Sequence, residues 1–451
     1  MERINKIVKN HISIILPSLV FLTIAIVYSY VKIGFSGDFE KNFYLALTGD
    51  TIWQGYDYNG YSPLLSRYFP LMLSHLSVSI SVLFGLINVK YLLSVFAFVV
   101  FSSHAIFLAV IYLNFPKDKK NIFSFILLSF LLSFFYLQHF ILTESFLGGL
   151  FIWIVFVIYF YVDFDKLSVF NSISLIIFSV FLVSSYPSVV LFIPMLLVFG
   201  IIKYFKTKNI TKSNSIVLFF SFFILTTAFL LNVYHIITPN SYLGSANFSL
   251  QMFTDLNFIV LMLLVLAVLF FSLLQNIKRY KKILIICTTI FSFAMGYIVL
   301  QITPILGYFY RTLSFGIPFL FTLFLIYTVV FKINLEFIYV KIVNFILLFC
   351  LLLGSLAYAK NINAHNLKII DYMENNKTIT IEKFQRKNTR YKFEIYYAIL
   401  ISSVFMENNN CKLLISLKDQ HHTMLIDYIG KKDAKLKKFG IDIYKFIEIQ
   451  S

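Results

Sequence analysis

The sequence predicts an all-α polytopic membrane protein, a bundle of about 11 transmembrane helices. Two observations carry this prediction. The chain is 59% hydrophobic and only 13% charged, which is more apolar and less charged than soluble domains usually are. Apolar runs of roughly 17 to 25 residues also recur along it, and a helix of that length crosses about 30 Å of hydrocarbon. Helices are expected because a chain surrounded by lipid must satisfy its backbone hydrogen bonds internally.

The positive charge supports the same fold class and sets the expected topology. The net charge is +17, but the cations stand in short clusters between the apolar runs, as is typical of cytoplasmic loops. This distribution argues against a nucleic-acid-binding protein. Arg3, Lys6 and Lys9 precede the first span at 12–35. We therefore expect a cytoplasmic N-terminus and a retained signal anchor.

Whether the apolar stretch 68–88 crosses the membrane decides on which side the later loops lie. A crossing there would place most of the later basic loops outside the cell. Taking 89–114 as the second span instead places Lys117, Lys119 and Lys120 inside. The stretch 68–88 is then expected to lie along the outer interface or to be re-entrant. The remaining spans are expected at 122–140, 147–162, 169–186, 188–205, 215–236, 256–275, 283–303, 313–331 and 342–359.

An odd number of crossings leaves the end of the chain outside. We expect residues 1–359 to form a transmembrane domain and residues 360–451 to form a small periplasmic α/β domain. Runs such as CKLLISL and FGIDIYKFIEI in this tail are strand-like or helical. The three cysteines have no spacing typical of a disulfide framework or a zinc site.

The loop after the first span is the main candidate for chemistry. Residues 36–88 are expected to form a catalytic extracytoplasmic loop with interfacial helices. Asp38 and Glu40 come first in it, and a carboxylate just outside a span suits the removal of a proton from a sugar hydroxyl. The alternatives are that these residues mark the water boundary or cap a helix. Lys41 and Arg67 are the cations of the same loop.

Further candidates stand where later spans meet the outer face. Arg311 is at the start of a span, and its guanidinium suits a bidentate contact with a phosphate such as that of a polyprenyl phosphate. The alternative is a side chain that snorkels to the interface. Glu144 is either a binding residue or a solvated turn residue. Tyr186 and Tyr308 either contact the substrate or belong to the aromatic belt of a membrane protein.

The sequence contains no Walker A loop, HExxH, Gly-x-Ser-x-Gly or Rossmann fingerprint. Nucleotide-driven transport, zinc proteolysis and hydrolase chemistry therefore lack support. Besides an enzyme that acts on a sugar hydroxyl in the 36–88 loop, two alternatives stay open. An O-antigen polymerase is expected to carry large external loops late in the chain, and these are short here. A lipid-linked sugar transporter or flippase is expected to carry charges in the middle of its spans, and these are nearly absent.

The loop resembles the GtrII-type glucosyltransferases that modify lipopolysaccharide O-antigen, within the wider GT-C membrane glycosyltransferases. That family has an acidic residue after the first span, a basic residue, a Gly-x-x-x-Trp element and a Gly-Arg-Pro-Leu-like element. The matching residues here, in the same order, are Asp38, Lys41, Gly49, Trp53 and the run from Gly60 to Leu64. The resemblance continues with Glu144, Tyr186, Arg311 and the segment 356–368. The arginine of Gly-Arg-Pro-Leu is missing, with Arg67 nearby.

The resemblance implies a GT-C-like bundle in a bacterial inner membrane that transfers a sugar such as glucose on the periplasmic side. The donor is expected to be an undecaprenyl-phosphate sugar, the acceptor a surface polysaccharide or lipid-linked glycan such as O-antigen, and the surroundings membrane lipid. We expect an inverting single displacement in which Asp38 takes the hydroxyl proton, Glu40 assists, and Arg311 with Arg67 or Lys41 neutralises the leaving phosphate. A divalent cation, Mg²⁺ or Mn²⁺, held by Asp38 or Glu40 is the alternative.

Overall fold

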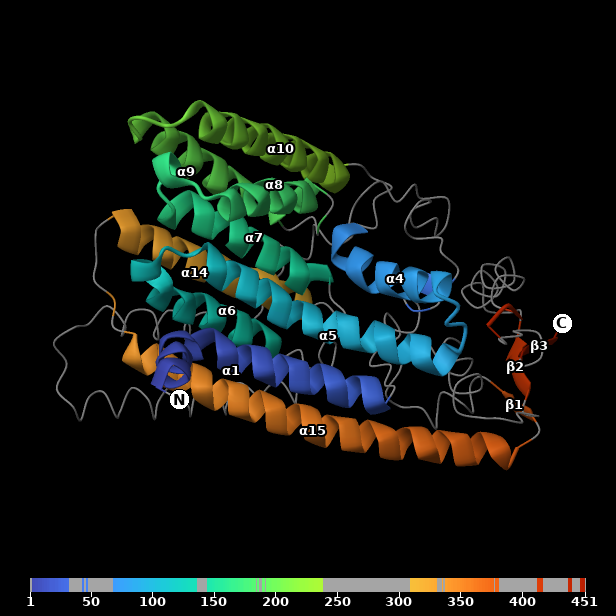
Figure 1. Cartoon of the computed structure of the whole chain (residues 1–451). Coiled ribbons are helices and arrows are strands. Elements are labelled where there is room, and N and C mark those ends of the chain that lie inside the picture. The colour runs from blue at the N-terminus through green and yellow to red at the C-terminus, as the bar shows by residue number, and fades with distance from the viewer. Residues whose placement is uncertain are drawn as a thin grey trace.

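The computed structural model of the chain is a bundle of long helices that lie alongside one another, with a small sheet near one end (Figure 1). It describes residues 2–31, 43, 46–47, 68–135, 144–183, 185, 189–190, 192–237, 309–330, 335, 337–376, 378–380, 412–416, 437–439 and 447–450. Within these ranges the chain is mostly helical, as the composition predicts.

The helices that the structure describes are α1 (Glu2–Val31), α4 (Tyr68–Leu83), α5 (Val89–Asn114), α6 (Phe123–Phe135), α7 (Glu144–Tyr161), α8 (Val169–Val183), α9 (Ile193–Lys206), α10 (Lys212–Ile237), α14 (Phe309–Val330) and α15 (Ile338–Glu374). Two 3₁₀ helices, η1 (Lys117–Ile122) and η2 (Phe164–Lys166), connect α5 to α6 and α7 to α8. A helix lies over each expected span that falls within the described ranges. The spans expected at 256–275 and 283–303 lie outside them.

Hydrogen bonds between side chains place many helix termini at one end of the bundle. Asn171 near the start of α8 donates to Oδ1 of Asn114 at the end of α5, at 2.9 Å. Lys341 near the start of α15 donates to Oδ1 of Asn121 in η1, at 2.8 Å. We call this the basic end, because nine lysines lie on the segments that meet there: Lys117, Lys119, Lys120, Lys166, Lys203, Lys206, Lys208, Lys212 and Lys341. The opposite end, where α1 ends and α5, α7 and α14 begin, is the loop end.

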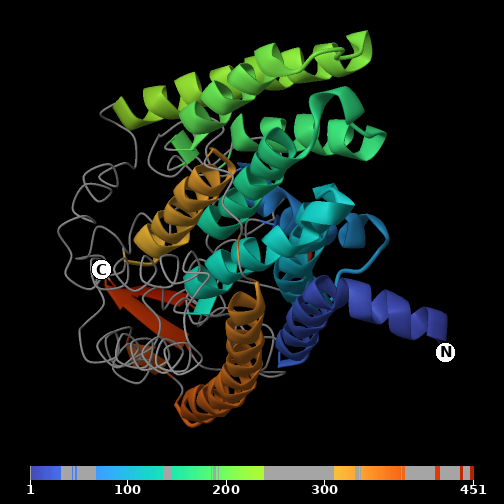
Figure 2. The ribbon, with the colours of Figure 1, turned by 90° about the vertical axis from the view of Figure 1, so that its left-hand side faces the viewer.

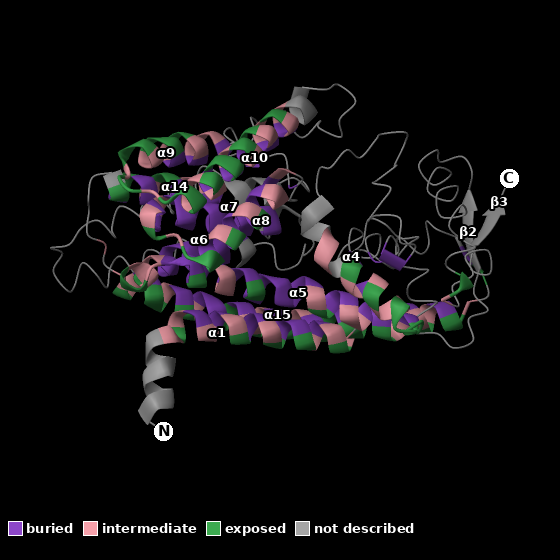
Figure 3. Ribbon diagram, turned by 45° about the horizontal axis from the view of Figure 1, so that its top comes forward, coloured by how far each residue is buried: buried purple, intermediate pink, exposed green. Residues whose placement is uncertain are grey.

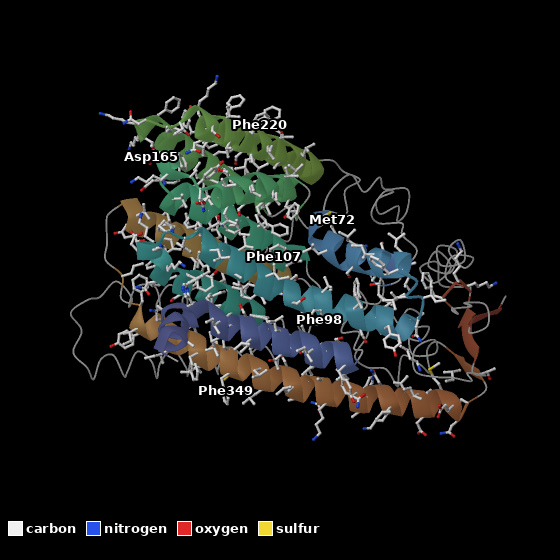
Figure 4. The ribbon with its side chains drawn as sticks, viewed as in Figure 1. Met72, Phe98, Phe107, Asp165, Phe220 and Phe349 are labelled. Carbon is white, nitrogen blue, oxygen red and sulfur yellow. The ribbon has the colours of Figure 1, made fainter. Side chains whose placement is uncertain are left out.

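Within the part of the chain that the structure describes, four helices are long and apolar enough to cross a membrane. They contain the segments His11–Val31, Val89–Asn114, Lys212–Val233 and Ile338–Glu374. Seen along its axis, the bundle has α10 on one side and α15 on the other (Figure 2). Its outer helices are buried on the inward side and exposed on the outward side (Figure 3). Phe220 of α10 and Phe349 of α15 point outward (Figure 4). Apolar side chains directed outward from long helices suggest a membrane protein.

Helix α4 packs antiparallel against the first half of α5 and also contacts α7. The turn between α4 and α5 is tight: Leu86 donates its backbone N–H to the carbonyl of Ser81 at 3.0 Å, and Gly85 takes the positive φ of 81°. Glycine suits this position because it has no Cβ to clash in the left-handed region. Helix α4 therefore runs along the axis of α5, and how the stretch 68–88 lies relative to a membrane stays a prediction.

Helix α15 runs without a break through Lys360, the first residue of the expected periplasmic domain. It continues because apolar and small residues recur every three or four positions and keep one face packed. The buried residues of this second half are Ser355, Ala359, Ile362, Asn366, Ile369 and Met373. The helix therefore continues past the end of the expected span at 342–359, and the expected periplasmic domain at 360–451 stays a prediction.

Three short strands follow α15 and form a parallel sheet in the order β1 (Thr378–Thr380), β2 (Lys412–Ser416) and β3 (Ile447–Gln450). Ile379 pairs with Leu413, and Ile415 pairs with Ile449. The strands β2 and β3 lie in the two runs, CKLLISL and FGIDIYKFIEI, that the sequence marks as strand-like or helical. Parallel neighbours require long connections, which agrees with the wide spacing of the strands along the chain.

Candidate functional site

Most of the site residues expected from the sequence lie outside the described ranges: Asp38, Glu40, Lys41, Arg67, Tyr186 and Tyr308. Two others lie on helices. Glu144 is the first residue of α7, and Arg311 is in the first turn of α14. The side chains of these two are not among the described ones. Both helices begin at the loop end and pack against each other, so the backbone positions of Glu144 and Arg311 belong to the same end of the bundle.

Ring contacts between helices show which residues lie at the same height along the bundle. In the antiparallel pair α1 and α5, Tyr28 packs against Phe101 with ring centroids 4.7 Å apart. Phe21 stacks on His104 at 5.8 Å. Because both helices rise about 1.5 Å per residue, the last residue of α1, Val31, lies within about one turn of the height of Phe96.

The same reasoning fixes the heights at which α7 and α14 begin. Phe151 of α7 packs against Phe107 of α5 at 5.1 Å, and α7 begins about two turns before Phe151. For α14 the link runs through α6, since Phe130 packs against His104 and Phe125 packs against Phe324. Counting residues back along α7 from Phe151 and along α14 from Phe324 places the first turns of these two helices within about one turn of the height of Phe96.

Phe96 itself joins three segments at this height. Phe43, in the loop after α1, packs edge-on against it with ring centroids 5.6 Å apart and an interplanar angle of 60°. His75 of α4 lies against it at 6.1 Å. Phe43 and Phe96 are fully buried, and His75 is 1% exposed. We call these three side chains the Phe96 cluster. They connect the loop, α5 and α4 where α1 ends and α7 and α14 begin.

The basic end is held together by lysines that bind helix carbonyls. Lys203 of α9 donates from Nζ to the carbonyls of Tyr159 and Val162 at 3.0 and 2.7 Å, and lies 4.8 Å from the ring centre of Phe164. Lys120 lies over the ring of Tyr112 at 4.4 Å. Burial, and secondarily the charge of Lys117, lowers the pKa of Lys120. The two hydrogen bonds of Lys203 place its positive charge at the negative end of the α7 dipole.

The bundle interior contains polar side chains but few that titrate. Tyr159, Ser221 and Ser179 of three different helices form a buried chain of hydroxyls, with oxygen separations of 2.7 and 2.8 Å. His104 is buried in the middle of α5. Among the described residues no Asp, Glu, Lys or Arg is buried. In that same part of the chain there is no group of three or more His, Cys, Asp or Glu side chains suited to hold a metal ion.

The Phe96 cluster and the contacts of Lys203 were not predicted from the sequence, although two features of the sequence indicate the cluster. Phe43, Ala46 and Leu47 have the spacing of one helix face, and all three are buried. His75 is an ionisable residue in an apolar helix, which alone would have marked it for attention. Comparisons with protein-family models, curated proteins and solved structures found no match for this chain.

Proposed function

We propose that this protein is a membrane glycosyltransferase that works at the loop end, which faces the periplasm of a bacterial inner membrane. It transfers a sugar from a polyprenyl phosphate to a surface polysaccharide such as O-antigen. One observation carries the proposal. The end of α1, the docked Phe43 and the first turns of α7 and α14 share one height in the bundle. Asp38 and Glu40 follow the end of α1 in the sequence, and Glu144 and Arg311 lie in the first turns of α7 and α14.

The spacing of the two ends supports a site at a membrane surface. From Phe96 to Asn114, at the end of α5, the helix rises about 27 Å. This is close to the thickness of the hydrocarbon core, about 30 Å. If the basic end faces the cytoplasm, as the positive-inside rule favours, the height of Phe96 corresponds to the outer interface. The phosphate of a polyprenyl-phosphate donor lies at that depth.

The proposed reaction is a single displacement at the anomeric carbon. The hydroxyl oxygen of the acceptor forms the new bond to that carbon, and the bond from the carbon to the phosphate oxygen breaks. Asp38 takes the hydroxyl proton, with Glu40 assisting. Arg311, with Arg67 or Lys41, neutralises the charge that develops on the leaving phosphate. The reaction is expected to invert the configuration of the sugar.

The test is the substitution Asp38→Asn, which keeps the size of the side chain but removes the base. Membranes containing the chain are supplied with a labelled polyprenyl-phosphate sugar and an acceptor polysaccharide. We expect transfer to fall at least about 100-fold, the usual lower contribution of a general base, while the amount of inserted protein stays the same. Asp118→Asn, at the basic end, is the control and should retain transfer. Normal transfer by the Asp38→Asn variant would contradict the mechanism.

A lipid-linked sugar transporter or flippase is the second candidate, and His104 is the observation that favours it. An ionisable residue buried halfway along a bundle often marks a transport path. His104 stacks on Phe21, and its Nδ1 is 3.3 Å from the carbonyl oxygen of Phe101. Uptake of a lipid-linked sugar into vesicles, lost in His104→Leu and without any transfer product, would favour transport over transfer.

A further inference from the structure

We propose that the turn between α9 and α10, at the basic end of the bundle, binds an anionic phospholipid. Lys206, Lys208 and Lys212 hold the phosphate of its headgroup, and the outward apolar faces of the two helices pack against its acyl chains. The proposal concerns the end of the bundle opposite the loop end. It therefore stands whether or not the protein is a transferase.

The charge of this part of the chain is strongly one-sided. Residues 166–237, from the end of η2 to the end of α10, contain five lysines and no aspartate or glutamate. Asp163 and Asp165 precede this stretch and flank Phe164, whose ring lies 4.8 Å from the ammonium group of Lys203. Lysines outnumber aspartates by five to two even when both are included. The turn is therefore complementary to an anion.

The three lysines of the turn are available to a ligand, whereas other lysines of the basic end are engaged inside the protein. Lys203 donates to two carbonyls of α7, and Lys120 lies over an aromatic ring. Lys206, Lys208 and Lys212 are exposed. Within the part of the chain that the structure describes, no hydrogen bond, ion pair or ring contact involves their ammonium groups. Their charge is directed to the surroundings of the bundle.

The backbone of the turn is held by its own hydrogen bonds. Thr207 donates from its backbone N–H and from its hydroxyl to the carbonyl of Lys203, at 2.9 and 2.8 Å. The hydroxyl of Thr211 accepts from the backbone N–H of Asn214 at 3.2 Å. Asn209 takes a φ of 64°, in the left-handed region that asparagine adopts more readily than most residues. A backbone fixed in this way reduces the entropy lost when a ligand binds.

Exposed apolar side chains continue from the lysines toward the middle of the bundle. Phe205 and Val198 of α9 are 81% and 53% exposed, and Phe223 of α10 is 64% exposed. Val198 lies about 12 Å from Lys206 along α9, and Phe223 lies about 16.5 Å from Lys212 along α10. One leaflet of hydrocarbon is about 15 Å deep. A soluble phosphate would use the lysines alone, whereas a phospholipid uses both surfaces.

The experiment measures which lipids contact the turn when the full chain is reconstituted in nanodiscs. The reporter is Phe205→Trp in a chain that also carries Trp53→Phe, and the buried Trp153 gives a constant background. Brominated phosphatidylglycerol or brominated phosphatidylcholine is mixed with the other lipid in unlabelled form, because bromine quenches only a nearby indole. A second reporter, Phe345→Trp, lies at a position 58% exposed on α15, on the other side of the bundle (Figure 2).

At low salt we expect the Phe205→Trp reporter to give a binding constant for phosphatidylglycerol at least about fivefold above that for phosphatidylcholine, the effect of about one lysine near a headgroup. Salt should reduce this preference by screening. Lys206→Gln combined with Lys212→Gln should abolish most of it, whereas the same two positions changed to Arg should retain it. Lys117→Gln combined with Lys341→Gln is the matched control, because it removes the same charge from the same end, and it should also retain the preference.

Three results would overturn the proposal. An equal loss of preference in the two double-glutamine variants would show that the net charge of the basic end acts, and not the turn. Equal preferences at the two reporters would show that no site is local to α9 and α10. Displacement of the quenching lipid by soluble glycerol phosphate would identify a site for a small phosphate instead of a phospholipid. Transfer activity enters none of these measurements, so a failure of the proposed transferase function would leave the test intact.

Discussion

Replacing Lys203 by Met is expected to weaken the bundle without affecting its chemistry. The methionine keeps the length and much of the volume of the side chain but removes the ammonium group. That group donates to two carbonyls at the end of α7, those of Tyr159 and Val162, at 3.0 and 2.7 Å. It also lies 4.8 Å from the ring centre of Phe164. The last carbonyls of a helix have no partner within it, so the loss is felt directly.

The magnitude follows from these contacts. A hydrogen bond to a charged group contributes about 1.5–3 kcal/mol, so two would give at most about 6 kcal/mol. The basic end is partly exposed, so water replaces part of the loss, and the variant avoids the cost of desolvating an ammonium group. We therefore expect a decrease of about 2–3 kcal/mol in the free energy of unfolding. Lys206→Met, three residues on at an exposed position, should cost less than about 0.5 kcal/mol.

The assay is unfolding in mixed micelles, followed by the fluorescence of Trp153. This residue is buried on α7, and the only other tryptophan, Trp53, is replaced by Phe in all samples. Transfer activity per folded molecule should equal that of the parent chain, because Lys203 lies at the end opposite the proposed site. Equal stability of the Lys203→Met and Lys206→Met variants would refute the assignment of Lys203 as the connection between α7 and α9.

Three further predictions concern packing and topology. Gly200→Ala should lower the free energy of unfolding by about 1–2 kcal/mol, because its Cβ would lie 2.8 Å from a phenyl ring of α10 and 3.2 Å from the ring of Tyr159; unchanged unfolding in micelles would contradict this. A double-mutant cycle of Tyr159→Phe and Ser221→Ala should give a coupling of about 0.6–1.7 kcal/mol, and strict additivity would show that their 2.7 Å contact contributes nothing. Cysteines placed at Asn42 and Lys377 should both react with an impermeant thiol reagent from outside; labelling of the tail only after lysis would mean that the count of eleven crossings is wrong.

The helical architecture was predictable because lipid surroundings force an apolar chain to satisfy its own backbone hydrogen bonds. Long apolar runs in lipid have few alternatives to a helix, and α5 begins and ends at the residues expected for the second span, Val89 and Asn114. The grouping of lysines at one end was predictable for a similar reason, since the clusters alternate with the spans. Which side of a membrane that end faces stays a prediction.

Features that depend on partners distant in the sequence could not be predicted. Nothing local to Phe96 distinguishes it from the many other phenylalanines of the chain, and its role follows only from Phe43 and His75 meeting there. The sequence shows Lys203 only as one of the cations clustered between apolar runs, whereas its contacts are to carbonyls at the end of a different helix. The roles expected for Asp38 and Glu40 stay predictions, because these residues lie outside the described ranges.

Helix α15 also constrains how the chain can change in length. Its 37 residues form a rod about 55 Å long, and only three residues separate its end from β1. A single inserted residue in the second half would turn everything beyond it by about 100° and raise it by about 1.5 Å, moving the buried face out of contact. An insertion of seven residues would nearly restore the rotation. Length changes in this half of α15 are therefore expected to be tolerated in steps of about seven residues. The length of the helix thus determines both the distance of the sheet from the bundle and its rotation about the helix axis.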